Sequence, residues 1–381
     1  MERDLKEKSL YVHAGPRGDK YTGAVNVPVY LTSTFDQEEL PARKPYEYSR
    51  GQNPTREALE QAIARLEGGK YGFAFSSGMA AISTALCLFA TGEHVLVTED
   101  CYGGTYRILT KFFARYGVEF DFVDTTDLEQ VKKAIKPNTR GIFVESPSNP
   151  LMRITDLAAL SQLAREKGLI TLIDNTFATP YLQKPLALGI DVVIHSATKY
   201  IGGHSDLLAG LIVVNDEQLA RQIKLVQMAF GAVLSPFDSY LTLRGLKTLA
   251  IRMEQQQSNA RELALWLRDR KKVKRVYYPG FSDHPGAEIH QRQARGPGAV
   301  ITIDLGSEEE AIAFINSTSI PVIGPSLGGV ETIITHPFSM SHAGIPAEIK
   351  NRLGITPGLV RISVGIEEVE DLKQDFSALD R

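Results

Sequence analysis

The sequence predicts an α/β protein that combines a mostly parallel sheet, covered by helices on both faces, with a smaller C-terminal α+β domain. Between residues 94 and 214, runs rich in Val, Ile and Leu alternate with amphipathic helical stretches. Continuous apolar runs of this kind are typical of strands buried on both faces of a parallel sheet. Residues 216–270 are then strongly helical, and the strands predicted after them, at 274–278, 299–305 and 359–364, alternate differently. The change of pattern favours a second sheet, which we expect to be antiparallel.

The elements of the first part follow in chain order. A helix is expected from Pro54, because Asn53 suits an N-cap, Pro the first helical position, and Gly68-Gly69 a stop. The apolar segment 73–75 leads into a helical run that extends to Phe89. The further strands are expected at 94–98, 119–123, 141–145, 169–173, 191–195 and 211–214. The helices between them are expected at 105–116, 127–135 and 156–167.

The C-terminal part and the domain limits complete this prediction. A long helical run covers 238–270, and shorter helices are expected at 308–316, 347–353 and 367–379. The first residues are rich in Gly, Pro and Thr with little periodicity, so we expect an arm, residues 1–52, that packs on a partner subunit. The predicted cofactor-binding α/β domain covers residues 53–245, and the predicted α+β domain covers residues 246–381.

Composition excludes several classes of protein. The 381 residues suit about two domains, with 43% apolar and 23% charged residues, as in ordinary globular proteins. A net charge of −3 gives no field for nucleic acid or an anionic membrane, so neither partner is expected. Residues 1–8 lack the apolar core of a secretion signal, and no apolar run could span a membrane. Two cysteines cannot form a disulfide framework, so we expect a cytoplasmic protein.

Lys199 is the most informative single residue. It follows the strand predicted at 191–195 and lies between Thr198 and the glycines Gly202-Gly203. A surface lysine would be ordinary, because burying an ammonium group is costly. A lysine held in a half-buried loop can instead have a lowered pKa and form a Schiff base with an aldehyde cofactor.

Polar groups gather at the carboxyl ends of the predicted strands, where ligands bind in parallel sheets. They occupy 145–149, 174–176 and 196–199. Asp174 could cap a turn, or it could keep a pyridine nitrogen protonated, which would make the ring an electron sink. Tyr102, in a glycine turn after another strand, could pack there, stack on a ring or transfer protons.

A phosphate cradle is predicted where a helix begins on small residues. Its members are backbone groups and hydroxyls from two segments: Ser77, Gly78, Met79, Ser196 and Thr198. A helix N-terminus offers free N–H groups to an anion, although Ser and Gly also begin ordinary helices.

Arg361 lies on the strand at 359–364, where it either pairs with an internal carboxylate or binds the α-carboxylate of an amino acid. Other chemistries lack their motifs: no G-x-G-x-x-G follows a strand, and no nucleophile elbow surrounds Ser76 or Ser77. His336 and His342 lack a metal-ligand pattern, so we expect them to be structural and predict no metal site.

Eight motifs together resemble the Cys/Met-metabolism family of pyridoxal-phosphate enzymes of fold type I, and the resemblance covers nearly the whole chain. They are Tyr-Ser-Arg-x-x-Asn-Pro-Thr, Ser-Ser-Gly-Met-Ala-Ala, Tyr-Gly-Gly-Thr-Tyr-Arg, Glu-Ser-Pro-x-Asn-Pro, Asp-Asn-Thr-Phe, His-Ser-Ala-Thr-Lys-Tyr-x-Gly-Gly-His-Ser-Asp, Ser-Leu-Gly-Gly-Val-Glu and Val-Arg-Ile-Ser-Val-Gly-Ile-Glu. The resemblance implies pyridoxal 5′-phosphate, a seven-stranded type of sheet and a homotetramer made of two active dimers.

The resemblance also implies roles for individual residues. Lys199, Tyr102 and Asp174 would be catalytic: Lys199 would carry the cofactor and shuttle protons, Tyr102 would stack on its ring, and Asp174 would pair with its nitrogen. The remaining cofactor contacts would come from Ser77, Gly78, Met79, Asn149, Thr176, Ser196, Thr198 and, from a neighbouring subunit, Tyr48 and Arg50. The substrate would be held by Asn149, Ser326, Arg361 and Glu331.

The reaction that we predict is γ-elimination of cystathionine to cysteine, 2-oxobutyrate and ammonia. Gly104, where methionine γ-lyases typically carry Cys, argues against that activity, and the Phe177 and Val330-Glu331 segments favour γ-lyases and γ-synthases. The alternatives are γ-replacement on an O-acyl-homoserine by cysteine, and β-elimination. A catalytically silent sensor on the same fold predicts decay at Lys199 or Asp174, yet both residues are present.

Overall fold

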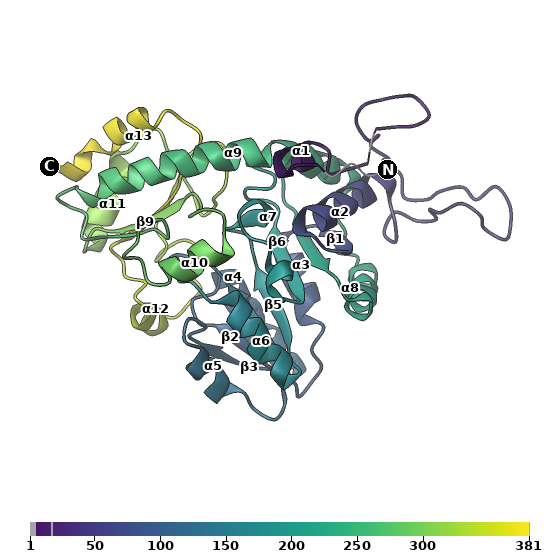
Figure 1. The fold of residues 1–381 in the computed structure, drawn as a ribbon, viewed down its shortest axis with the longest axis horizontal. Helices are drawn as coiled ribbons and strands as arrows, with labels where there is room; N and C mark the ends of the chain where they lie inside the picture. The colour runs from purple at the N-terminus through teal and green to yellow at the C-terminus, as the bar shows by residue number, and fades with distance from the viewer. Residues whose placement is uncertain (1–4, 17, 381) are drawn as a thin grey trace.

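The computed structural model describes residues 5–16 and 18–380 (Figure 1). The first four residues and residue 17 of the predicted arm, and residue 381 of the predicted C-terminal domain, lie outside the described residues. The α-helices are α1 (Glu7–Val12), α2 (Pro54–Glu67), α3 (Gly78–Leu86), α4 (Gly103–Lys111), α5 (Leu128–Ala134), α6 (Leu157–Lys167), α7 (Thr179–Leu182), α8 (Glu217–Phe230), α9 (Pro236–Arg268), α10 (Ala287–Gln293), α11 (Glu308–Ser317), α12 (Ala347–Leu353) and α13 (Val369–Asp375). Three 3₁₀ turns, η1 (Phe113–Tyr116), η2 (Pro185–Leu188) and η3 (Phe376–Asp380), join them.

A seven-stranded sheet forms the centre of the larger domain. Its strands are β1 (Tyr71–Phe75), β2 (His94–Thr98), β3 (Glu119–Val123), β4 (Thr139–Glu145), β5 (Ile170–Asp174), β6 (Val192–Ser196) and β7 (Gly210–Val214). Their order is β1-β7-β6-β5-β4-β2-β3; the pairs β1–β7 and β7–β6 are antiparallel and the other four pairs are parallel. The predicted mostly parallel sheet is therefore confirmed.

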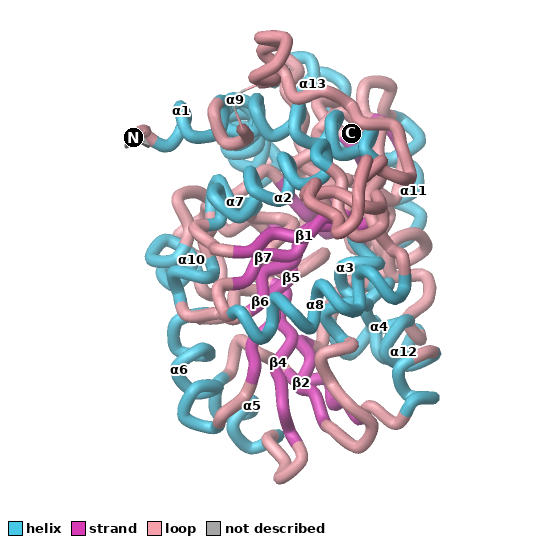
Figure 2. The backbone as a smooth tube through the Cα atoms, turned by 90° about the vertical axis from the view of Figure 1, so that its right-hand side faces the viewer, coloured by secondary structure: helices cyan, strands magenta, loops and turns pink. Residues whose placement is uncertain are grey.

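Helices cover both faces of this sheet, as expected from strands that are apolar throughout. One buried cluster joins Val95 and Phe143 of the strands to Ala81 of α3 and Ile223 of α8, while another joins the opposite face to α5 and α6. Figure 2 shows α6 on one side of the strands and α3, α4 and α8 on the other. The sheet is thus shielded from water except at its ends, where a ligand site can form.

The predicted start and stop of α2 are both confirmed. The side-chain oxygen of Asn53 accepts hydrogen bonds from the backbone N–H of Thr55 (3.0 Å) and Arg56 (3.5 Å). Gly68 ends the helix with a φ of 73°, a left-handed conformation that glycine adopts without a steric penalty. The helix predicted at 105–116 is instead divided into α4 and the 3₁₀ turn η1.

The C-terminal sheet has the order β10-β11-β12-β9-β8. Its strands are β8 (Arg275–Tyr277), β9 (Val300–Asp304), β10 (Val322–Ile323), β11 (Ile333–Thr335) and β12 (Leu359–Ser363). The expected antiparallel pairing holds for all but the edge pair β10–β11, which is parallel. These two strands were not predicted, because two or three residues are too few to show a period.

Helix α9 spans 33 residues and runs along the molecule from α1 and α2 to the C-terminal domain (Figure 1). The predicted domain limit after residue 245 falls inside this helix, so the limit itself stays a prediction. Gly245 brings α9 directly onto the loop that carries Lys199: a Cβ atom there would lie 2.5 Å from the carbonyl oxygens of both Ile201 and Gly202.

The N-terminal arm has little structure of its own. Residues 18–52 contain no helix or strand, only an isolated bridge between Thr34 and Tyr48. Large side chains are exposed along it, including Tyr21, Val25 and Leu40, and Figure 1 shows its loops extending away from the body. Contact with a partner subunit remains a prediction that this exposure favours. Over the described ranges 5–16 and 18–380, the helices are too short or too polar to cross a membrane.

Substituting Gly245 should loosen the contact between α9 and the Lys199 loop. The Cβ of Gly245→Ala would press on two backbone oxygens, and overpacking of this kind costs about 1–3 kcal/mol. That cost outweighs the roughly 1 kcal/mol that Ala gains over Gly in a helix. We expect a lower free energy of unfolding in urea for Gly245→Ala and almost no change for Ser258→Ala, an exposed position on the same helix. Equal stabilities of both variants would contradict the close approach.

Candidate active site

A cavity of about 180 Å³ lies at the carboxyl ends of β4, β5 and β6, where residues from both domains meet. Most of the residues predicted from the sequence line it: Ser77, Gly78, Met79, Tyr102, Asn149, Asp174, Thr176, Ser196, Thr198, Lys199 and Arg361. The site lining also includes residues that were not predicted as site residues, among them Glu145, Phe177 and Ser341.

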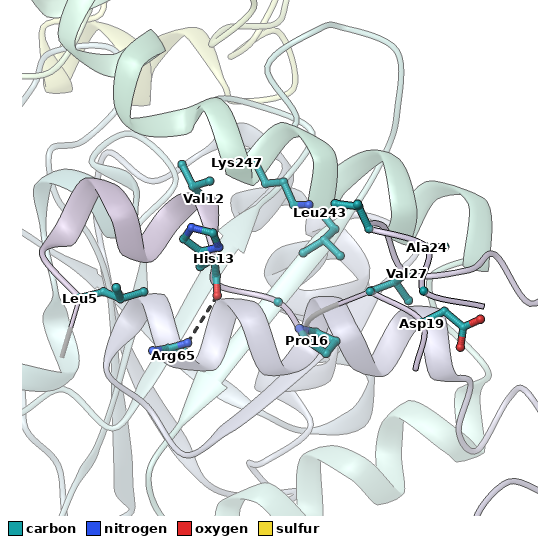
Figure 3. Close-up of a pocket in the computed structure, with 14 residues that line it drawn as sticks. Leu5, Val12, His13, Pro16, Asp19, Ala24, Val27, Arg65, Leu243 and Lys247 are labelled. Atoms are coloured by element: carbon teal, nitrogen blue, oxygen red, sulfur yellow. Dashed lines mark hydrogen bonds between the residues drawn. The ribbon is translucent and has the colours of Figure 1, made fainter. Parts of the chain in front are cut away.

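A larger cavity, of about 910 Å³, lies between the arm, α2 and α9 (Figure 3). Its walls include Leu5, Pro16, Arg65 and Leu243, with Arg65 donating a hydrogen bond to the carbonyl of His13 at 3.4 Å. The volume depends on the exposed arm, and the wall brings together no buried acid and base. The smaller cavity is therefore the candidate active site.

Lys199 is held in a tight loop directly after β6. The N–H of Gly203 donates to the carbonyl of Lys199 (2.8 Å), and the N–H of Gly202 donates to the carbonyl of Ala197 (2.7 Å). The Lys199 ammonium donates to Ser326 Oγ at 2.8 Å. Burial, and after it the nearby charge of Arg361, lower the pKa of Lys199 to about 8 against an opposing effect of Asp174. An amine with this pKa is available as a nucleophile and base near neutral pH.

Two buried carboxylates face each other at the ends of adjacent strands. Asp174 and Glu145 are register partners of β5 and β4. Asp174 Oδ1 accepts hydrogen bonds from the N–H (3.0 Å) and hydroxyl (2.5 Å) of Thr176, while Glu145 Oε2 accepts one from the N–H of Tyr102 (2.8 Å). Burial raises the pKa of both carboxyls, and for Glu145 the neighbouring Asp174 adds to the shift.

The start of α3 supplies a cradle for an anion. Ser77 Oγ caps the helix by accepting from the N–H of Ala80 (3.1 Å), and the N–H groups of Gly78 and Met79 have no partner within a helix at these positions. A Cβ at Gly78 would lie 2.8 Å from Ser196 Oγ, so only glycine lets the helix start and the Ser196 hydroxyl lie this close together. Backbone donors, hydroxyls and the helix dipole are the groups that bind phosphate.

Arg361 projects from β12 into the same cavity and is 1% exposed. Its guanidinium donates to Asn149 Oδ1 (3.0 Å), the carbonyl of Ser326 (2.6 Å) and Thr335 Oγ1 (3.0 Å). All three partners are uncharged, so the internal ion pair considered from the sequence is not formed. Nε has no partner, and burial lowers the pKa of the guanidinium to about 10. A buried cation in these surroundings would gain most from the carboxylate of a ligand.

Tyr102 stands at the start of α4 with 37% of its surface exposed. A Cβ at Gly104 would lie 2.4 Å from Tyr102 Cε1 and 2.8 Å from Met79 Sδ. Glycine at position 104 therefore lets the tyrosine ring lie over the helix start, at the edge of the cavity. A side chain at this position would displace the ring.

Four predicted site residues lie outside the lining. Ser326 reaches the site indirectly, through Lys199 and Arg361. Glu331 is exposed and does not contribute to the wall, although Pro325 and Leu327 of the same segment do. Tyr48 is half exposed, and Arg50 donates to the carbonyl of Met228 (2.8 Å) in a different part of the surface. Within its own chain, neither residue of the arm reaches the cavity lining.

The residues present fit a cofactor that carries an aldehyde, a ring nitrogen and a phosphate. The buried Lys199 provides the amine, Asp174 a carboxylate with Oδ2 still available, and α3 the anion cradle. Gly78 packs so closely against Ser196 that any side chain there would separate the helix start from the Ser196 hydroxyl, and this close approach is the observation that carries the fit.

Comparison with known proteins agrees with the geometry. Residues 8–380 match the family model described as Cys/Met metabolism PLP-dependent enzyme. The chain is 50% identical to cystathionine gamma-lyase of Bacillus subtilis, over 98% of each chain. It is 53% identical to cystathionine beta-lyase MetC of the same organism, over 96% of this chain and 94% of the relative. A crystal structure of cystathionine gamma synthase from Xanthomonas oryzae pv. oryzae in complex with cystathionine is 40% identical, with a TM-score of 0.96, over 99% of this chain and 98% of that chain.

Removing the buried ammonium should stabilise the cofactor-free protein in a pH-dependent way. Below pH 8 Lys199 is charged both folded and unfolded, so the folded state bears the full cost of burial. Between pH 8 and 10.5 the folded state loses its proton first, and the cost fades as pH rises. Lys199→Met should raise the free energy of unfolding by up to about 3 kcal/mol at pH 7, and by much less at pH 10. Urea unfolding at the two pH values measures this, and an equal difference at both would contradict the lowered pKa.

Proposed function

The chain belongs to the Cys/Met metabolism PLP-dependent enzyme family, and from this premise we propose that it cleaves cystathionine by γ-elimination. The products would be cysteine, 2-oxobutyrate and ammonia. The observation that carries the proposal is the buried Arg361 without a carboxylate partner, in the same cavity as the low-pKa amine of Lys199. The Arg361 guanidinium can bind the α-carboxylate of an amino acid, and the Lys199 amine can remove its α-proton.

The cofactor would be held at four places. Lys199 would bind its aldehyde carbon, Asp174 its ring nitrogen, and the Gly78–Met79 helix start with Ser196 and Thr198 its phosphate. Tyr102 would stack on the ring, Ser77 would support the helix start by capping it, and Asn149 and Thr176 would contribute polar contacts. When bound, pyridoxal phosphate supplies an electron sink for the negative charge left at Cα after proton removal.

The side chains of the cavity would each have a separate role in the reaction. Arg361 and Asn149 bind the α-carboxylate and orient the Cα–H bond toward Lys199. The amine of Lys199 takes the proton from Cα, which its pKa of about 8 permits at neutral pH. It would pass this proton to the carbon of the cofactor that carried the aldehyde oxygen, and the freed amine can then take a second proton from Cβ. The phenol of Tyr102 stands at the exposed edge, where it can donate a proton to the departing sulfur. Asp174 would meet the ring nitrogen, and its register partner Glu145, whose pKa is raised by burial and by Asp174, lies beside it.

The choice of γ-elimination is supported by residues beside the cofactor contacts. The absence of a side chain at Gly104 leaves room for the ring of Tyr102, and Phe177 lines the cavity. Glu331 would bind the distal amine of cystathionine from the exposed segment that follows Ser326. The same cavity would serve γ-replacement, in which cysteine displaces the acyl group of an O-acyl-homoserine. The 40% identical gamma synthase structure supports that alternative.

β-Elimination is the second candidate, because the 53% identical relative is a cystathionine beta-lyase. It would break the Cβ–sulfur bond and give homocysteine, pyruvate and ammonia. It needs only the first proton removal by Lys199, so an enzyme built for γ-elimination has every group that it requires. The ratio of the two products is therefore the quantity to measure.

Assembly is the remaining part of the proposal. The exposed arm would carry Tyr48 and Arg50 into the cavity of a neighbouring subunit, where the guanidinium would bind the cofactor phosphate. Two such active dimers would make a homotetramer. The support is that neither residue contributes to the cavity lining of its own chain and that large apolar side chains of the arm are exposed.

A product assay tests the reaction. Purified enzyme with pyridoxal phosphate should convert L-cystathionine mainly to cysteine and 2-oxobutyrate, measured by chromatography. Lys199→Ala should abolish turnover while the protein remains folded. Homocysteine and pyruvate as the main products would favour β-elimination. Net formation of cystathionine from O-acyl-homoserine and cysteine, without cleavage, would favour the synthase.

Mixing two inactive variants tests the shared site. Arg50→Ala and Lys199→Ala should each lose activity alone. When the two variants are co-expressed, a hybrid dimer contains one chain of each kind. One of its two sites would combine an intact Lys199 with an intact Arg50 from the other chain, and the second site would lack both. Equal mixing should restore about a quarter of wild-type activity, since half of the dimers are hybrids. If Arg50 instead acted within its own chain, the hybrids would recover nothing.

A further inference from the structure

His342 lies in the turn region between β11 and α12 and is completely buried. Both of its ring nitrogens make hydrogen bonds. Nδ1 lies 2.9 Å from the hydroxyl of Ser341, which lines the active-site cavity, and Nε2 lies 3.0 Å from the carbonyl oxygen of Asn149. The ring therefore joins a C-terminal segment to the end of β4, 193 residues earlier in the chain.

The partners decide where the proton of the ring lies. A carbonyl oxygen can only accept, so Nε2 carries the hydrogen and donates it to Asn149. Nδ1 is then the acceptor, and the Ser341 hydroxyl donates to it. A second ring proton would remove this acceptor and place a cation close to Arg361. Burial and the nearby Arg361 accordingly lower the pKa of His342 to about 4, so the neutral ring is the form present near neutral pH.

The bond to Asn149 matters because this residue is held from both sides. Arg361 Nη1 donates to its side-chain oxygen at 3.0 Å, and His342 donates to its backbone oxygen. The next carbonyl, of Pro150, accepts from Thr302 Oγ1 of β9 at 2.7 Å. Three side chains of the C-terminal part thus determine the position of one short segment of the larger domain.

We propose that His342 is a positioning residue for substrate, which fixes the Asn149 backbone so that the Asn149 amide and the Arg361 guanidinium converge on the α-carboxylate. Ser341 selects the tautomer that makes this possible. The inference rests on the proposed function in one respect, that the cavity takes an amino acid by its carboxylate. It adds a residue that contacts neither substrate nor cofactor and acts through Asn149.

A merely structural histidine offers the matched control. His290 is also buried, its pKa is also lowered to about 4 by burial, and its Nε2 lies 2.9 Å from the carbonyl oxygen of Gly296. It does not line the active-site cavity. His290→Ala and His342→Ala therefore remove comparable buried rings, but only His342→Ala removes the hydrogen bond to the backbone of Asn149.

The experiment separates carboxylate binding from general damage. The holoenzyme is titrated with L-norvaline and with butylamine, which is the same molecule without the carboxylate, and binding is followed by the absorption of the bound cofactor. His342→Ala should weaken L-norvaline binding about tenfold or more, leave butylamine binding unchanged, and raise KM for L-cystathionine more than it lowers kcat. His342→Gln, whose Nε2 can still donate to Asn149, should recover most of the affinity.

Several results would overturn the proposal. They are unchanged L-norvaline affinity in His342→Ala, equal losses for both ligands, the same L-norvaline loss in His290→Ala, or no recovery in a folded His342→Gln. If His342→Ala does not fold, His342→Gln and Ser341→Ala, which should weaken L-norvaline binding by a smaller factor, decide the question. A wild-type enzyme that binds L-norvaline in the expected way but does not cleave cystathionine would refute the proposed reaction and leave this inference standing.

Discussion

Burial of positive charge is the constraint on which the site depends. Lys199 and Arg361 lie in the same cavity, and burial together with the nearby guanidinium disfavours the protonated form of the lysine. The effective penalty for desolvating an ion in a protein is several kcal/mol. The protein meets it with oxygens: the Ser326 hydroxyl for the lysine, and Asn149, Ser326 and Thr335 for the arginine. Asp174 and Glu145 balance the charge without forming an ion pair with Arg361.

The same constraint explains why two sheets are needed. Asp174, Glu145 and the Lys199 loop come from the carboxyl ends of parallel strands, which bring polar groups to one edge. With this edge alone, the charged groups of Lys199 and Arg361 would be exposed to water on one side. The segments around Ser326 and Ser341, together with β12, close this side. The proposed substrate site is therefore shared between the two domains, whereas most of the proposed cofactor contacts within the chain belong to the larger one.

The sequence predicts the strands of the large sheet closely, because a strand buried on both faces is apolar at every position. β2, which is buried along its whole length, matches its predicted range. The range of β3 also matches, although this edge strand is partly exposed and alternates phenylalanines with Glu119 and Asp121. Lys199, Asp174, Asn149 and Arg361 do line one cavity. Ser341 was missed as part of the lining, and the bond of His342 to Asn149 was not foreseen, because both depend on contacts far apart in the chain. Glu145 was placed in the polar group 145–149 at a strand end but was given no role of its own, since its pairing with Asp174 follows from the register of β4 and β5. The roles of these residues in binding and catalysis remain predictions that the proposed variants test.

The close contact of Gly245 with the Lys199 loop has a mechanical consequence. Because α9 is one continuous helix from the edge of the larger domain into the smaller one, it connects the two domains without a hinge. Tilting α9 would push on the backbone of Ile201 and Gly202, and so on the loop that carries Lys199, the proposed anchor of the cofactor. Any change in the angle between the two domains is therefore coupled to the position of this lysine.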